Sequence, residues 1–265
     1  FPDGEMITLL KKIMATVLLS FLISAGICNA APLKDAPDLV SYPLVLEYHQ
    51  IRPVAHSDLD VSVENFKQEL DWLQEHNYRT LSLYKFNRCI DKHQPLPPKS
   101  VLITFDDGYE GVYKYALPEL RKRYMHATLF LVTDSLNKKD PAYARITTAQ
   151  VQKMGHDYLV DLGSHTVNHE ELSPLSAAQL DYELSYSKAA LEKLTDKPCL
   201  ALSYPYGDFN TQVLSAVKNA GYRVAFAGYD DNIASHLKRY TIPRIYVGQY
   251  LEKNNFKAFK QTFNE

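Results

Sequence analysis

The sequence predicts an α/β fold, a distorted (β/α) barrel of about seven to eight parallel strands in a single domain. Short apolar runs alternate with amphipathic helical segments along most of the 265 residues. Several runs, such as 100–105 and 127–132, are apolar almost throughout, which is typical of strands buried on both faces of a parallel sheet. No glycine-rich nucleotide-binding sequence follows the first run, and this favours a barrel over a doubly wound sheet.

The strand candidates share apolar or β-branched residues and end at polar or turn residues. They span 44–49, 79–83, 100–105, 127–132, 159–164, 199–204, 222–227 and 242–247. Because they are separated by helical segments, each strand and the helix after it would form one β/α unit.

The helical segments carry their own start signals. Ser62 is a predicted N-cap for 62–76, a helix whose buried face would carry Phe66, Leu70 and Leu73. Two later helices, over 147–154 and 176–194, open with a Thr or Ser three residues before a Gln, the spacing of a capping box. The tail 254–263 repeats phenylalanine at helical spacing, which predicts a terminal docking helix.

The first 30 residues predict a secretory signal. Two lysines precede the apolar run 13–27, and Ala30 stands before a small-residue cleavage point. A membrane-spanning helix would need about 20 apolar residues, whereas this run is shorter and contains two serines and a glycine. We therefore expect upstream residues and a signal peptide at 1–30, a linker at 31–43 and the functional domain at 44–265. The mature protein would be secreted or periplasmic, without a stable membrane span.

Charge and cysteine content exclude some partners and ligands. The formal net charge is −2, and no clustered basic face indicates a nucleic-acid partner. Cys89 and Cys199 would remain after cleavage; neither belongs to a CxxC sequence, so cysteine is not a predicted metal ligand. Whether these two cysteines pair, and the oligomeric state, stay open.

Polar side chains follow several strand candidates, at the end where functional residues of parallel barrels gather. They are His49 after the first strand, Asp106 and Asp107 after the third, His165 and His169 after the fifth, and Tyr206 after the sixth. Two adjacent carboxylates repel each other, so either the pair is solvated at the surface or a cation holds it.

His165 and His169 are four residues apart, so on one helical turn both rings would point the same way. Such a pair is more often a surface feature than a metal site. An aspartate from another strand end changes this, because two histidines and one carboxylate leave coordination positions open, as catalytic metals require. One aspartate would bind the cation, whose charge would let the other remain ionised.

Three motifs then carry a family resemblance: "TFDDG" (104–108), "SHTVNH" (164–169) and "YPYG" (204–207), in this order. Together they resemble the first three motifs of the polysaccharide deacetylases, carbohydrate esterase family four, over roughly 44–247. The resemblance implies a divalent metal held by Asp107, His165 and His169, zinc before cobalt, nickel or iron. It also implies that Asp106 is the catalytic base and that the Tyr206 backbone N–H faces the oxyanion.

Two departures from the family pattern matter. Many members carry an arginine two residues before the third-motif proline, where this chain has Ser203; Arg244 is either its replacement or an ordinary strand-end salt bridge. Many members also supply an acid histidine late in the chain, but no histidine follows His236. His49 in "LEYHQI" would take that role, unless it is a core histidine. An early "YH" with "SYPYG" resembles the subgroup that deacetylates poly-β-1,6-N-acetylglucosamine.

The sequence therefore predicts a metal-dependent N-deacetylase acting on N-acetylglucosamine units of an extracellular, N-acetylated polysaccharide. The alternatives are a deacetylase of peptidoglycan or chitin oligomers, a non-catalytic glycan-binding protein, and a non-haem iron oxygenase, which also uses two histidines and a carboxylate. Four tyrosines near strand ends are candidate walls of a glycan groove: Tyr48, Tyr109, Tyr204 and Tyr206.

Overall fold

The computed structural model describes residues 43–228, 239–248 and 259–263. Within these ranges the strands form a parallel sheet with the order β10-β1-β5-β6-β7-β8-β9, and a further strand, β4, pairs with β5. The strands are β1 (Leu44–Tyr48), β4 (Arg79–Thr80), β5 (Ser100–Phe105), β6 (Ala127–Leu131), β7 (Val160–Ser164), β8 (Ala201–Ser203), β9 (Val224–Phe226) and β10 (Ile245–Tyr246). Each falls inside or within a residue of a segment that the sequence predicts.

The chain after β9 curls the sheet toward closure. Ile242, which precedes β10, pairs in parallel with Phe226 of β9. Ile245 of β10 then pairs with Leu46 of β1. One short segment therefore contacts both ends of the strand order, and the distorted α/β barrel predicted from the sequence is confirmed.

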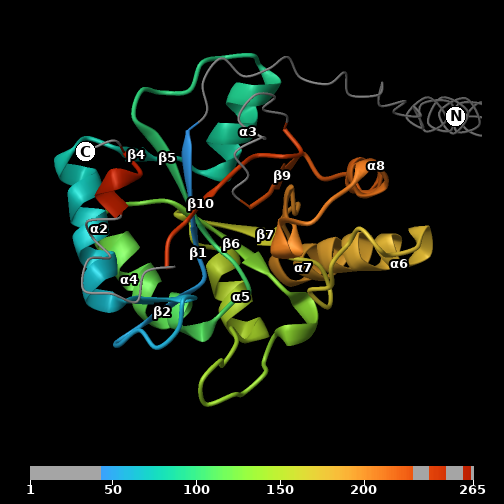
Figure 1. Ribbon diagram of the computed structural model, residues 1–265, viewed down its shortest axis with the longest axis horizontal. Helices are drawn as coiled ribbons and strands as arrows, with labels where there is room; N and C mark the ends of the chain where they lie inside the picture. The colour runs from blue at the N-terminus through green and yellow to red at the C-terminus, as the bar shows by residue number, and fades with distance from the viewer. Residues whose placement is uncertain (1–42, 229–238, 249–258, 264–265) are drawn as a thin grey trace, which may run out of the picture. The chain divides into compact units, whose positions relative to one another are not determined.

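Helices surround the strands in Figure 1. They are α2 (Val63–Glu75), α3 (Leu83–Asp91), α4 (Leu117–Lys122), α5 (Thr148–Gly155), α6 (Ala177–Asp181), α7 (Ser187–Thr195) and α8 (Thr211–Asn219). A π-helical turn, Tyr182–Tyr186, joins α6 to α7, so the predicted helix 176–194 contains a bulge. A small parallel pair, β2 (Gln50–Arg52) and β3 (Asp60–Ser62), lies outside the main sheet.

The predicted caps are present. The Ser62 side chain accepts a hydrogen bond from the Asn65 N–H at the start of α2. Capping boxes open α5 and α6. The strand predicted at 79–83 is shorter than expected, because the Ser82 side chain accepts from the Lys85 N–H and starts α3 there.

Alternate residues of β1 and β5 face opposite sides, as strand geometry requires. Val45 and Leu102 belong to the smaller apolar cluster, which also includes Phe86 of α3, whereas Leu46 and Ile103 belong to the larger cluster. Further along the same faces of these strands, polar residues replace apolar ones: Glu47 and His49 follow Val45, and Thr104 and Asp106 follow Leu102. One end of the barrel interior is therefore apolar and the other is polar.

The terminal predictions fall largely outside this structure. The signal peptide at 1–30, nearly all of the linker and part of the tail helix lie outside the described residues. Within the described ranges, no helix is both long and apolar enough to span a bilayer. Cys89 and Cys199 are both free and buried, so they do not pair with each other.

Candidate active site

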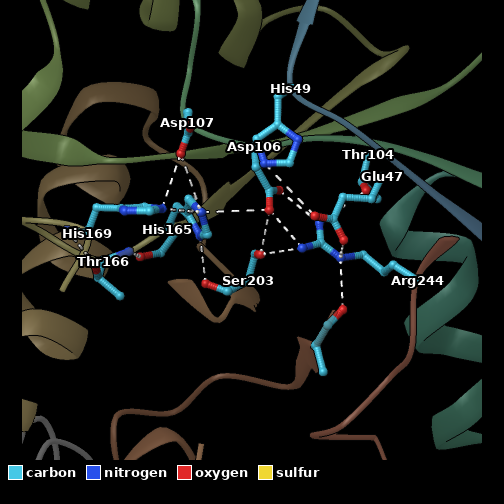
Figure 2. Close-up of polar contacts among 12 residues, drawn as sticks. Glu47, His49, Thr104, Asp106, Asp107, His165, Thr166, His169, Ser203 and Arg244 are labelled. Carbon is cyan, nitrogen blue, oxygen red and sulfur yellow. Dashed lines mark hydrogen bonds and ion pairs between the residues drawn. The ribbon is translucent and has the colours of Figure 1, made fainter. Parts of the chain in front are cut away.

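The two adjacent aspartates turn toward different partners where β5 ends (Figure 2). Asp107 has a φ of 67° and Gly108 a φ of 69°, so the chain passes through two left-handed residues after Asp106. Arg145 Nη1 holds this turn by donating to the Asp107 carbonyl oxygen at 2.9 Å. As a result the Asp106 carboxylate faces Arg244, whereas the Asp107 carboxylate faces the two histidines.

Asp107, His165 and His169 form a compact set of three metal-type ligands. Asp107 Oδ1 lies 3.6 Å from His165 Nε2 and 3.3 Å from His169 Nε2. The two Nε2 atoms are 3.1 Å apart. Ligands at zinc bond lengths of about 2.0–2.1 Å in a tetrahedron are about 3.3 Å from one another. The three groups therefore fit one small divalent cation.

The protonation of the two imidazoles also suits a cation. His165 Nδ1 lies 2.8 Å from the Ser203 carbonyl oxygen, and a proton on Nδ1 leaves the Nε2 lone pair free. Burial, and then the neighbouring His165, lower the pKa of His169 to about 4, so its ring is neutral at pH 7. The Nε2 atoms of both rings and a carboxylate oxygen of Asp107 then converge on one point.

The loop that carries both histidines is not helical, and this corrects the predicted helical turn. Thr166 and His169 have φ values of 67° and 63°, and no helix covers residues 165–169. The Ser164 hydroxyl accepts from the Thr166 N–H, and the Thr166 hydroxyl accepts from the His169 N–H. The two rings meet because this loop folds back, and not because residues four apart share a helical face.

Arg244 lies in the middle of the polar inner face and is 2% exposed. Its Nη1 and Nη2 atoms donate to Oδ1 and Oδ2 of Asp106 at 2.8 and 2.7 Å. Its Nε lies 3.2 Å from the Glu47 carboxylate, and Nη2 also donates to the Ser203 hydroxyl. Burial would raise the pKa of Asp106, but the Arg244 guanidinium and His165 hold it well below its usual range. Asp106 is therefore ionised at neutral pH.

Glu47, His49 and Asp106 are a second group of potential ligands close to the first. The Arg244 guanidinium already contacts both carboxylates of this group. It supplies the positive charge there, so we assign the metal-type geometry to the Asp107 group alone.

His49 follows β1, the neighbour of β10 in the sheet. Its Nε2 lies 3.9 Å from the Glu47 carboxylate, and its ring meets the Tyr246 ring edge-on at 5.3 Å between centroids. No group in the described ranges hydrogen-bonds to its buried Nδ1. The His49 side chain is 13% exposed and lies beside Asp106.

Tyr206 lies in a 3₁₀ turn, Pro205–Gly207, after β8. Its φ of 58° places it in the left-handed region, and the residue is 71% exposed. The ring packs edge-on against His169, with centroids 4.7 Å apart. The third motif therefore stands beside the histidine loop.

Comparison with known protein families shows which family has this arrangement. The polysaccharide deacetylase family model matches residues 93–225, half of the chain, including both aspartates, both histidines and Tyr206. The chain belongs to the polysaccharide deacetylase family. This deacetylase is similar to the poly-beta-1,6-N-acetyl-D-glucosamine N-deacetylase of Staphylococcus aureus (strain N315), with 27% identity over 92% of each chain.

Solved structures agree on the fold of the deacetylase. The Streptococcus pyogenes deacetylase PplD, solved in complex with acetate, superposes with a TM-score of 0.71 at 24% identity, over 82% of this chain and 97% of that one. IcaB from Ammonifex degensii gives a TM-score of 0.70 at 21% identity, over 84% and 96%. At these identities the likeness concerns the fold.

The site residues of the deacetylase line an open groove of about 680 Å³. Tyr109, Tyr204 and Tyr206 contribute to it, and Arg145 lies over the Tyr109 ring at 3.9 Å. Tyr48 was predicted as a groove wall, and this is wrong. Its neighbours Glu47 and His49 face the groove, so Tyr48 faces α2, where its hydroxyl donates to Glu69.

Sequence reasoning missed several residues that shape the site. Glu47 could have been found, because it stands two residues before His49 on the same strand face. Arg145, which lines the groove, and Glu183, which contacts the histidine loop, carried no signal, because only the folded chain brings them near. The sequence marks Ser203 only as the place of a missing arginine, whereas in the structure its hydroxyl donates to Asp106 at 3.0 Å.

Proposed function

We propose that the protein is a metal-dependent N-deacetylase that hydrolyses acetamido groups of N-acetylglucosamine units in an extracellular polysaccharide. The observation that carries this proposal is the ligand set of Asp107, His165 and His169 beside the ionised Asp106, in one open groove. The named activity of the staphylococcal relative supports poly-β-1,6-N-acetylglucosamine as the polymer.

Asp107, His165 and His169 would hold a divalent metal, with zinc as the first choice and cobalt, nickel and iron as alternatives. When bound there, such a metal supplies Lewis-acid polarisation of a carbonyl and acidifies water.

Asp106 acts as the base in this proposal. Its carboxylate accepts a proton from the attacking water, and Arg244 and Ser203 keep it ionised and aimed, since both donate to its oxygens. Arg244 takes the place of the arginine that many family members carry where this chain has Ser203.

The Tyr206 backbone N–H donates to the oxyanion that develops as the carbonyl carbon becomes tetrahedral. His49 gives a proton to the departing amine. The C–N bond breaks, a C–O bond to the acetyl carbon forms, and acetate and a free sugar amine leave.

We also propose that the catalytic domain spans 44–265 and works outside the cytoplasm after removal of a signal peptide. The charged and apolar pattern of residues 1–30 supports this location.

Acetate release from a panel of glycans tests the function. Poly-β-1,6-N-acetylglucosamine oligomers should release acetate faster than chitin oligomers or peptidoglycan fragments, chelation should abolish release, and added Zn²⁺ or Co²⁺ should restore it. His169→Ala should lose both bound metal and activity while keeping its fold. Full activity of a metal-free His169→Ala protein would refute the metal assignment, and preference for chitin or peptidoglycan would move the substrate to the alternatives.

A further inference from the structure

A buried carboxylate lies directly behind the histidine loop. Glu183 is located in the π-helical turn between α6 and α7 and is 2% exposed. Its Oε2 accepts hydrogen bonds from the backbone N–H groups of Val167 and Asn168, both at 2.9 Å. Its Oε1 accepts from Asn168 Nδ2 at 2.7 Å. All three donors belong to the loop between His165 and His169.

This loop needs external support. Thr166 and His169 have left-handed backbone conformations, which residues other than glycine keep only where the surroundings fix them. On one side, the N–H groups of Thr133 and Asp134 donate to the carbonyl oxygens of Thr166 and Val167. On the other side, Glu183 accepts hydrogen bonds from the N–H groups of Val167 and Asn168. The loop is thus held from both faces.

The carboxylate and the loop depend on each other. Successive backbone N–H groups that surround an anion form a favourable concave site. A buried charge without such donors would be strongly unfavourable. If the loop opened, Glu183 would lose its partners; if Glu183 were neutralised or shortened, the loop would lose the acceptor that selects its conformation.

We propose that Glu183 is a positioning residue that holds His165 and His169 in the arrangement that binds the metal. This inference rests on the metal site of the proposed function. It assigns no contact with substrate to Glu183, which acts only through the shape of the loop.

Metal affinity measures this role without reference to activity. Metal-stripped wild type, Glu183→Gln and Glu183→Asp would be titrated with Zn²⁺ by calorimetry, and the visible absorption of bound Co²⁺ would report the ligand geometry. Glutamine keeps the size of the side chain but removes one acceptor oxygen and the charge. Aspartate keeps the charge but is one methylene shorter, so its carboxylate lies farther from the loop N–H groups. The matched control is Glu170→Gln, an exposed carboxylate next to His169. Thermal unfolding of the stripped proteins checks that each variant folds.

We expect Glu183→Gln and Glu183→Asp to bind Zn²⁺ about 10–100-fold more weakly than wild type, with an altered Co²⁺ spectrum. Glu170→Gln should match wild type. Equal affinity in wild type and both Glu183 variants would overturn the inference while leaving the metal site intact. So would equal weakening in Glu183→Gln and Glu170→Gln with a normal Glu183→Asp, since only charge would then matter. No binding by wild type would overturn the metal assignment itself, and this inference with it.

Discussion

Glu69 is a buried carboxylate on α2, outside the groove, and its replacement by glutamine should change how stability depends on pH. The side chain is 1% exposed, and its Oε2 accepts from the Tyr48 hydroxyl at 2.9 Å. No described residue hydrogen-bonds to its Oε1. Burial raises the pKa of Glu69 to about 8 from an ordinary value of 4.5. The native protein therefore keeps this carboxyl protonated at neutral pH.

Proton linkage decides whether Glu69 makes the protein more or less stable as the pH rises. Below pH 4.5 the Glu69 carboxyl is protonated in both the native and the unfolded states, so its ionisation does not change the free energy of unfolding. As the pH rises toward 8, the unfolded chain releases the proton and the native protein does not. The free energy of unfolding then falls by about 1.4 kcal/mol per pH unit. Between pH 5 and pH 8 the ionisation of this one group lowers the free energy of unfolding by at most about 3.5 kcal/mol.

Glu69→Gln keeps the size of the side chain and an acceptor for the Tyr48 hydroxyl, but it cannot ionise. The free energy of unfolding of Glu69→Gln, measured relative to wild type, should therefore rise by up to about 3.5 kcal/mol between pH 5 and pH 8. Any constant cost of the buried amide shifts the whole curve and leaves its slope unchanged. Urea unfolding at several pH values would measure this change in the free energy of unfolding. The probe is the fluorescence of Trp72, the single tryptophan, which lies on the same helix.

Glu64→Gln is the matched control, because Glu64 is an exposed carboxylate in the first turn of α2. Its difference from wild type should stay within about 0.5 kcal/mol at every pH. Parallel pH curves for wild type and Glu69→Gln would refute the reasoning, since Glu69 would then ionise equally in both states.

Three further predictions concern the groove. Asp106→Asn should retain metal but lose about 10²–10⁴-fold in kcat, whereas Asp107→Asn should first weaken metal binding; metal analysis beside acetate release separates them, and equal metal loss in both would contradict the division of roles. His49→Ala should lower kcat on the acetamide by about 10²–10⁴-fold and spare an activated aryl acetate, which needs no proton for its leaving group; equal loss on both substrates would indicate a packing role. Arg244→Met should lower the free energy of unfolding by about 3–5 kcal/mol, because it leaves the buried carboxylates of Glu47 and Asp106 without their cation; an unchanged urea midpoint would show that they do not need it.

The sequence by itself determined the strands of the main sheet, the starts of α2, α5 and α6, and the family, because these depend on local patterns. Apolar runs predict buried strands wherever both faces of the sheet are covered. A serine or threonine three residues before a glutamine satisfies the first N–H groups of a helix without help from elsewhere, as at Ser176. Residue types at strand ends were likewise readable, since one end of a parallel barrel collects them.

Only the tertiary structure decided how those residues meet. Arg244 reaches Asp106 because Ile245 pairs with β1 and brings the last strand beside the first, a contact with no local signal. The two histidines converge through a left-handed loop that Glu183 supports from a helix, and not through helical spacing. Such contacts depend on the closure of the barrel and on buried charges finding donors far away in the chain, so no window of sequence contains them.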